Sequence, residues 1–251
     1  MIIDAPRGDD LPHLRKLWTE SFGDTEAFWR DFIAAVRPLA HCRCLWEEKT
    51  LAAALYWFDC SWEDKPIAYL YGVATAKAFR GRGACRALME DTHRYLKKLG
   101  YHGIVLVPAE PWLFEMYRKM GYTLCANVRE FTCAAGDPIP LQQLTPEQYA
   151  ARRRQFLPAG GVVQEGATLE LIAAQGKFYA AERCLAVCSV QNEKLVVSEL
   201  LGEAEAAPGL VAALGFREGA IRTPGKDKAF AMYHSLTDDP AAPRYFGLAM
   251  D

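Results

Sequence analysis

The sequence predicts an α+β protein in which mixed, mostly antiparallel sheets are flanked by helices and arranged as two modules in tandem. Patterns with helical and with strand spacing alternate along the 251 residues, which is typical of sheets covered by helices. Hydrophobic residues make up 51% and charged residues 24%, the balance of a globular chain with a buried core. Residues 134–145 hold a glycine, two prolines and two glutamines, which is a linker composition. We therefore place a domain boundary at residue 135 and expect domains over residues 1–135 and 136–251.

Composition and charge exclude several classes of function. The formal net charge of −2 leaves no global basic bias toward nucleic acid or an anionic membrane. No apolar run approaches the roughly 18 residues that a membrane span needs, and the acidic first ten residues carry no apolar segment of a signal peptide. The eight cysteines then fit free thiols in a reducing compartment. We expect a cytoplasmic protein without a nucleic-acid or membrane partner.

The first module is predicted to begin with two helices. Apolar residues recur at helical spacing from Leu11 to Trp18, after the acidic pair Asp9 and Asp10, which favours a helix start. A second apolar face begins at residue 24 or 25, and Pro38 ends it.

Strands and helices then alternate in this module. Residues 41–46 and 51–59 predict a hairpin, because Tyr56, Trp57 and Phe58 are typical of a pleated surface, and a third strand covers residues 67–75. The later predicted elements are a helix that ends before Gly100, a strand over residues 103–108, a helix over 111–119 and strands over 122–125 and 128–133.

The second module repeats this mixture in a weaker form. Helices are predicted over residues 146–156 and 169–174, strands over 178–182, 185–190 and 195–201, and a short helix over 207–214. Leu214-Gly215-Phe216 resembles Met120-Gly121-Tyr122 of the first module, since each follows a helix and opens a strand. This similarity hints at a diverged internal repeat.

One loop of the first module predicts an anion site. Arg80-Gly81-Arg82-Gly83 lies between a strand and a helix, where the unpaired N–H groups of the first helical turn and the helix dipole favour a phosphate. The glycines allow the backbone to approach closely, and the two arginines can add charge-assisted hydrogen bonds. The loop is neither a P-loop nor a dinucleotide fingerprint, because the glycine spacing of both patterns fails.

Two motifs resemble those of the GCN5-related N-acetyltransferase (GNAT) superfamily. Its motif A reads Arg/Gln-x-x-Gly-x-Gly/Ala after a strand, and Arg80, Gly83 and Cys85 fall on the three defined positions, with Cys85 departing from the pattern. Its motif B ends in Tyr-x-x-x-Gly-Phe/Tyr, which Tyr117-Arg118-Lys119-Met120-Gly121-Tyr122 matches. The resemblance covers about residues 1–133 and implies the GNAT fold.

The resemblance also implies a cofactor and its contacts. Acetyl-CoA would bind as cosubstrate in a V-shaped opening between the strands at residues 67–75 and 103–108. Its pantetheine arm would pair with the backbone of Val73 and Thr75, and its pyrophosphate would lie on the loop that starts at Arg80. The full set of implied cofactor-binding residues is Val73, Thr75, Arg80, Gly81, Arg82, Gly83, Ala84 and Cys85.

The implied catalytic residues are Tyr117, as the acid that protonates the leaving thiolate, and Val73, whose N–H would bind the oxyanion. Many family members carry a glutamate on the strand before motif A, whereas residues 68–75 contain no acid. The general base therefore stays open among Glu110, Asp59, water and the terminal carboxylate of Asp251. The last of these is suggested by a similarity to the enhanced-intracellular-survival acetyltransferases, which pair two such domains and whose C-terminus reaches the active site.

These features predict an acetyl-CoA-dependent N-acetyltransferase that transfers an acetyl group directly to a primary amine of a small molecule or peptide. The second module resembles a degenerate GNAT copy without the CoA motif, and it could form a wall of the site or a homodimer contact. The alternative is a non-catalytic acyl-CoA-binding or scaffold module, which Cys85 and the missing strand glutamate favour. No metal is expected, because Cys42 and Cys44 lack a second pair of ligands at zinc spacing.

Overall fold

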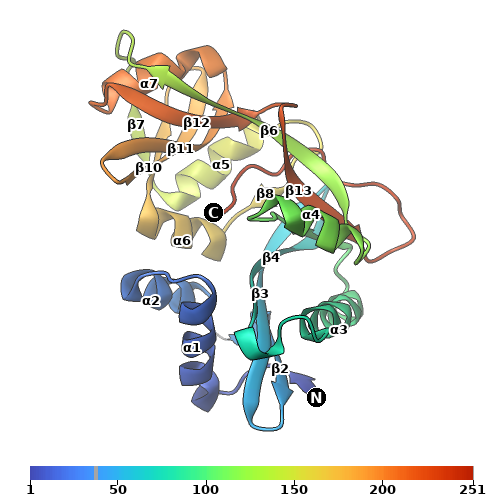
Figure 1. Ribbon diagram of the computed structural model, residues 1–251. Helices are drawn as coiled ribbons and strands as arrows, with labels where there is room; N and C mark the ends of the chain where they lie inside the picture. Colours follow the sequence, from blue (N-terminus) through green and yellow to red (C-terminus); the bar gives the residue numbers. More distant parts are fainter. Residues whose placement is uncertain (37–38, 251) are drawn as a thin grey trace. The chain divides into compact units, whose positions relative to one another are not determined.

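The computed structural model describes residues 1–36 and 39–250, and its contacts divide the chain into two compact units. Unit 1 comprises Met1–Leu106, Trp112–Thr123 and Tyr233–Ala241, and unit 2 comprises Val107–Pro111, Leu124–Met232 and Ala242–Asp251. Each unit is a sheet flanked by helices, which is the predicted fold class (Figure 1). Both units are assembled from segments that are distant in the sequence. The assignment of residues 1–135 and 136–251 to a catalytic and a degenerate copy stays a prediction.

Unit 1 is a sheet with helices on both faces. Its strands lie in the order β1-β2-β3-β4-β5, followed by the end of β13. In Figure 1, α1 and α2 lie on one side of β3 and β4, and α3 lies on the other. The elements are β1 (Ile2–Asp4), α1 (Leu11–Ser21), α2 (Glu26–Ala35), β2 (Cys42–Glu47), β3 (Thr50–Trp62), β4 (Lys65–Thr75), α3 (Ala84–Lys98), β5 (Gly103–Leu106) and α4 (Pro111–Arg118). The strands β6 (Thr123–Ala134) and β13 (Lys228–Ser235) belong mostly to unit 2, and unit 1 contains the first residue of β6 and the end of β13.

Local chemistry explains most of these boundaries. The Thr25 hydroxyl accepts a hydrogen bond from the Phe28 N–H and caps α2. The predicted helix end at Pro38 lies outside the described residues. Two predictions were wrong: β1 was missed, because its three residues are too short to show an alternating pattern, and residues 122–133 form one long strand, β6, in place of two.

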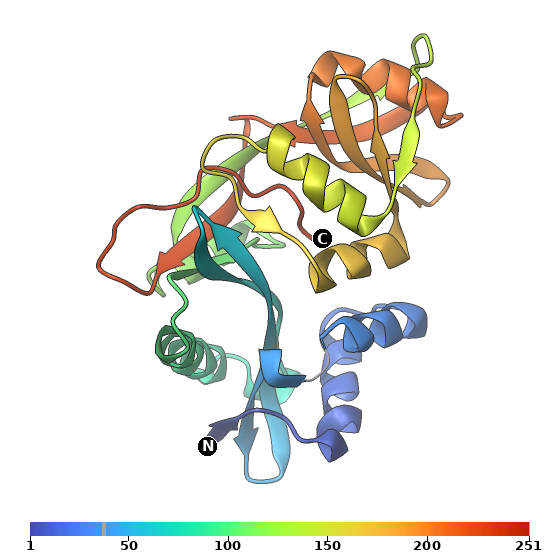
Figure 2. The same ribbon diagram turned by 180° about the vertical axis from the view of Figure 1, so that it is seen from behind.

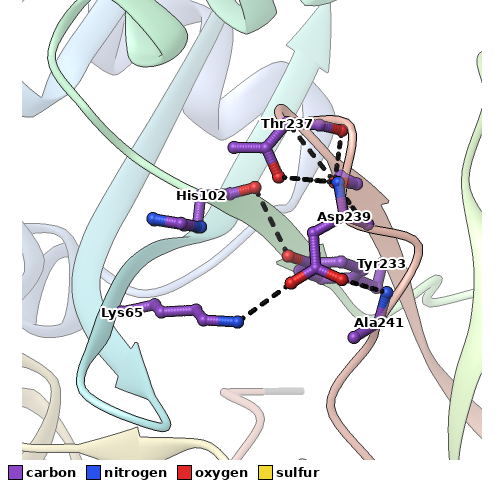
Figure 3. Close-up of polar contacts among 7 residues, drawn as sticks. Lys65, His102, Tyr233, Thr237, Asp239 and Ala241 are labelled. Atoms are coloured by element: carbon purple, nitrogen blue, oxygen red, sulfur yellow. Dashed lines mark hydrogen bonds and ion pairs between the residues drawn. The ribbon is translucent and has the colours of Figure 1, made fainter.

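A segment from late in the chain completes unit 1 (Figure 3). The main-chain N–H of Leu236 donates to the carbonyl of His102 at 2.9 Å, just before β5. Beyond it, the Asp239 carboxylate accepts hydrogen bonds from the Lys65 ammonium at 3.0 Å and from the Ala241 N–H at 2.9 Å. These contacts fasten the loop after β13 to the β3–β4 hairpin and the start of β5.

Unit 2 is also a sheet covered on two faces. Its strands lie in the order β6-β12-β11-β10-β9-β7, with α5 and α6 on one face and α7 on the other (Figure 2). The strand β7 lies inside the predicted linker. The elements are β7 (Gln142–Leu144), α5 (Pro146–Phe156), β8 (Val163–Gln164), α6 (Ala167–Gln175), β9 (Lys177–Ala180), β10 (Cys184–Gln191), β11 (Lys194–Gly202), α7 (Ala207–Ala213) and β12 (Glu218–Pro224).

The core of unit 2 contains a buried ion pair that holds the C-terminal segment. The Arg153 and Glu199 side chains are only 2% and 0% exposed, and both oxygens of Glu199 accept from Arg153 at 2.8 Å. The hydroxyls of Tyr149 and Tyr245 donate to the same carboxylate at 2.6 and 2.9 Å. The amide of Gln164 donates to the Leu248 carbonyl at 2.7 Å, so the tail packs against this unit.

Candidate active site

The strand β4 is interrupted by a β-bulge at Gly72 and Val73. Ala74 pairs with Ala54 and Tyr71 pairs with Tyr56, so two residues of β4 lie opposite one residue of β3. A β-bulge twists its strand and redirects backbone groups, and bulges are frequent beside active sites. The bulge is therefore a local distortion at the point where the sequence places the oxyanion donor, Val73.

Beyond the bulge, β4 and its parallel neighbour β5 are no longer paired. The ladder joins residues 67–69 of β4 to residues 103–105 of β5, whereas β4 continues to Thr75. The carboxyl end of β4 thus has backbone groups that do not pair with β5. The expected opening between the two strands, with a ligand paired to Val73 and Thr75, stays a prediction.

The loop after β4 presents its backbone to solvent at the start of α3. Residues 80–83 are all exposed, and Gly81 and Gly83 have φ values of +73° and +83°, which disfavour residues with a side chain. Arg80 donates from Nε to the Thr75 carbonyl at 3.0 Å, which braces the loop against the end of β4. Because α3 starts at Ala84 without a side-chain cap at Gly83, its first N–H groups can donate hydrogen bonds to an anion.

Cys85 lies on the first turn of α3, behind this loop. It is half-buried, and burial raises the pKa of its thiol, while a hydrogen bond with Thr75 and the charge of Arg86 act in the opposite direction. The thiol is therefore protonated at neutral pH and does not resemble a reactive cysteine.

Tyr117 lies on α4 close to Cys85. Only 6% of Tyr117 is exposed, and its ring meets that of Tyr122 edge-on at 5.7 Å. Burial, and secondarily the neighbouring Cys85 thiol, raise the pKa of the Tyr117 phenol well above its usual range. The tyrosine of motif B and the first helical turn of motif A thus lie together, and the phenol carries its proton at neutral pH.

The side chains considered as general base lie in different parts of the chain. Asp59 accepts a hydrogen bond from the Tyr101 hydroxyl and lies 3.7 Å from Nε2 of His41, near the paired ends of β4 and β5 and away from the bulge. Glu110 is exposed and directly precedes α4. Asp251 lies outside the described residues.

Sequence reasoning missed two acids, one that is linked to the bulge through Trp18 and one that contacts the chain just after β4. The Trp18 ring lies against Gly72, and its Nε1 donates to the Asp24 carboxylate at 2.9 Å. At the end of α1, the Glu20 carboxylate accepts from the Lys77 N–H at 2.5 Å, directly before the glycine loop. Glu20 also lines a groove of about 1060 Å³ between α1 and α2. Neither acid belongs to a sequence motif, and only the packing of α1 on β4 brings them there.

Within the residues that the structure describes, the cysteines that the sequence singles out do not form a metal site. The sulfurs of Cys42 and Cys44 lie 3.9 Å apart in the core. Among residues 1–36 and 39–250, no three histidine, cysteine or acidic side chains group as metal ligands. All eight cysteines are free thiols. No helix in the described part of the chain is long and apolar enough to cross a membrane.

Comparisons with known proteins agree with this geometry. Residues 3–125 match the family model described as an acetyltransferase (GNAT) domain. Over these residues the chain is similar to a GNAT domain. The bulged strand, the glycine loop and the buried tyrosine all lie within these matched residues. No curated protein matches the chain.

Solved GNAT structures share the fold over most of the chain. A GCN5-related N-acetyltransferase from Kribbella flavida is 19% identical, with a TM-score of 0.70 over 92% of this chain and 70% of that one. One from Anabaena variabilis ATCC 29413 is 13% identical, with a TM-score of 0.74 over 94% and 73%. Eis1 from Mycobacterium abscessus is 15% identical, with a TM-score of 0.68 over 94% and 74%.

Proposed function

We propose that this protein is an N-acetyltransferase that transfers the acetyl group of acetyl-CoA directly to a primary amine of a small molecule or peptide. The observation that carries the proposal is the buried Tyr117 beside the first turn of α3, where the exposed glycine loop begins the helix. A cofactor held by that loop would extend its thioester along the unpaired end of β4, toward the bulge.

The cofactor would be bound mainly by backbone groups. Val73 and Thr75 would pair with the pantetheine arm, as an added strand pairs with a sheet edge. The pyrophosphate would lie on residues 80–85, where the N–H groups of the helix start and the side chains of Arg80 and Arg82 supply positive charge.

The reaction would proceed by attack of the amine nitrogen on the thioester carbon, which forms a C–N bond and places negative charge on the carbonyl oxygen. The Val73 N–H would stabilise this oxyanion. As the C–S bond breaks, Tyr117 would donate its proton to the thiolate. Burial raises the pKa of the phenol, and it would also raise the basicity of a thiolate that forms in the same site.

The amine must lose a proton before it attacks. Asp24 and Glu20 are carboxylates beside the bulge and the loop, and we add them to Glu110, water and the Asp251 carboxylate as groups that could attract or deprotonate the ammonium. Asp59 ranks lower because it pairs with Ala68 near the start of β4, away from the bulge. The groove between α1 and α2 would admit the acceptor.

Unit 2 would be a degenerate second copy of the domain. In unit 2 the antiparallel hairpin β10–β11 has a bulge near Val187, and α7 connects β11 to its parallel neighbour β12. Unit 1 has the same order, because the bulged hairpin β3–β4 is followed by α3 and by β5, which is parallel to β4. The loop between β11 and α7 carries Glu203 and Glu205 where the first copy carries two arginines. Negative charge there would repel a pyrophosphate. The free thiols fit a cytoplasmic location.

Thermal unfolding with acetyl-CoA, CoA or no ligand tests the cofactor site. A ligand at about a hundred times its Kd should stabilise the wild type by about 2.7 kcal/mol, and the double variant Arg80→Ala, Arg82→Ala should lose this effect. The matched control, Lys97→Ala with Lys98→Ala, removes the same charge from the other end of α3 and should keep it. No shift of the wild type at any concentration would refute the cofactor assignment.

Turnover on a panel of amines tests the catalytic role. Tyr117→Phe should lower kcat about 100-fold, as loss of a general acid does, with the stabilisation by acetyl-CoA unchanged. Cofactor binding without turnover on any amine would support the non-catalytic acyl-CoA-binding module, which Cys85 on motif A and the acid-free strand over residues 68–75 also favour.

A further inference from the structure

Two histidines from distant parts of unit 1 stack behind the tyrosine of the proposed site. The rings of His93 on α3 and His234 on β13 lie 4.2 Å apart with an interplanar angle of 24°. Nε2 of His93 lies 2.9 Å from the Tyr122 hydroxyl, and Nδ1 of His234 lies 3.0 Å from the Gly121 carbonyl. Both contacts end on the turn that directly follows α4.

The protonation states of this cluster follow from its partners. A carbonyl oxygen only accepts hydrogen bonds, so Nδ1 of His234 carries the hydrogen that it donates to Gly121. Burial, then the proximity of His234 and Arg94, lower the pKa of His93 to about 3, and burial raises that of Tyr122. At neutral pH His93 is therefore an uncharged imidazole, and in its Nδ1–H tautomer Nε2 accepts a hydrogen bond from the Tyr122 phenol.

This turn determines where Tyr117 lies. The Tyr117 carbonyl accepts from the N–H groups of Met120 at 2.8 Å and Tyr122 at 3.1 Å, and the rings of the two tyrosines touch. The helix α4 has only eight residues, too few to be stable without tertiary contacts. A side chain on Gly121, whose φ is +88°, would lie 3.1 Å from the His234 ring, so the glycine also makes room for the histidine.

We propose that His93 and His234 form a latch that positions Tyr117 against the start of α3. His93 holds Tyr122 from the side of α3, and His234 holds the Gly121 carbonyl from the side of β13. The two histidine rings also stack on each other, so the contacts to α3 and to β13 are joined. The histidines touch no reacting atom and act only through the turn, and the catalytic consequence rests on the proposed function.

Acid should open the latch. The groups that face His93 are Tyr122 from the turn after α4, His234 from β13 and Arg94 from its own helix, and Tyr122 in turn faces Tyr117 and Cys85. A proton on His93 would make both ring nitrogens donors, so that Nε2 could no longer accept a hydrogen bond from Tyr122. It would also place a cation against the face of His234 and near Arg94.

Amide hydrogen exchange of residues 113–124 tests the latch without requiring turnover. His93→Leu and His234→Leu should each speed exchange of the Met120 and Tyr122 amides about tenfold, whereas residues 84–88 of α3 should be unchanged. His93→Gln and His234→Asn keep a hydrogen-bonding group near the lost nitrogen and should exchange as the wild type does. His13→Leu, which removes an exposed imidazole from α1, serves as the control.

If the leucine variants do not fold, the wild type provides a second measurement. After correction for intrinsic rates, lowering the pH from 7 to 4 should speed exchange of the same amides in the wild type and not in His93→Gln. Equal exchange in wild type and both leucine variants, or equal acid sensitivity of wild type and His93→Gln, would overturn the latch.

Kinetics separate the latch from the proposed function. The leucine variants should lower kcat about tenfold, because a misplaced acid transfers its proton poorly, with KM for acetyl-CoA within twofold. If the wild type turns over no amine but the leucine variants still exchange faster than the wild type, the proposed function is refuted and the positioning of α4 by the two histidines is not. Full kcat in both leucine variants, beside an active wild type, would refute the positioning role.

Discussion

The bulge of β4 exists because one position carries no side chain. At Gly72, with φ of +61°, a Cβ would lie 2.7 Å from Cζ3 of Trp18 and 3.1 Å from Cδ2 of Tyr56. The missing side chain lets the indole pack directly on the strand beside Val73. The shape of the site at the oxyanion position therefore depends on a contact between an aromatic core residue and bare backbone.

Substituting this glycine should be costly. Gly72→Ala should lower the free energy of unfolding by about 2 to 4 kcal/mol, since it adds a clash with the core to the strain of a positive φ. Gly81→Ala is the matched control, because its φ is +73° but a Cβ there meets nothing within 4 Å, and it should cost about 1 to 2 kcal/mol. Urea unfolding of the three proteins gives the comparison, and equal losses would contradict the close packing of Trp18.

Residues with a local signature could be predicted from the sequence, and those defined by packing could not. Arg80, Gly83 and Tyr117 could be singled out because they stand in spaced motifs, and their roles in the site stay predictions. Asp24 and His234 are single polar residues without a motif, and their importance appears only when α1 packs on β4 and β13 reaches α4.

At the scale of elements, the resemblance between Leu214-Gly215-Phe216 and Met120-Gly121-Tyr122 has a local cause. In both, the residue after glycine donates its N–H to a carbonyl five residues earlier, and the glycine donates to one three residues earlier. Tyr101 and Gly100 do the same after α3. This is the Schellman ending of a helix, which favours glycine followed by an apolar residue. In strand order α7 corresponds to α3 rather than α4, so the three-residue similarity does not align the copies.

Helix boundaries could be predicted where apolar residues recur at helical spacing over a long stretch of sequence. The helices α1, α2, α3 and α5 begin and end within a few residues of their predicted bounds. The strands β1, β7 and β8 have three residues or fewer, and their pairing is decided by distant partners, so the local pattern carries no signal for them. The triplet Arg152 to Arg154 is typical of a solvated helix face, yet its central residue is buried against Glu199.

The C-terminal segment should depend on this buried pair. Arg153→Met should lower the free energy of unfolding by about 3 to 5 kcal/mol, because it leaves the Glu199 carboxylate buried without its cation. The neighbouring pair Arg154 and Glu165 is about half exposed, so Arg154→Met should cost about 1 kcal/mol or less. Limited proteolysis after residue 240 should be faster in Arg153→Met alone. Equal protease resistance in both variants would show that the pair does not hold the tail.

At the scale of the whole molecule, two units of similar strand order raise the question of how many cofactors bind. The loop after β4 is basic and the loop after β11 is acidic, so we expect one acetyl-CoA per chain. Isothermal titration should give a stoichiometry of one, and Arg80→Ala with Arg82→Ala should abolish the binding heat. Replacing Glu203 and Glu205 with alanine should leave the stoichiometry at one. A second site in the wild type would contradict a silent second copy.

The fastening of the loop after β13 to unit 1 has a consequence for protein synthesis. Lys65 and Asp239 are 174 residues apart in the chain, so at typical translation rates the ribosome needs roughly 10 to 30 s between making one and making the other. During that interval unit 1 lacks residues 233–241, among them His234. Until these residues are made, β5 has an open sheet edge, and an incomplete chain released from the ribosome would carry the loop at residues 80–83 without His234.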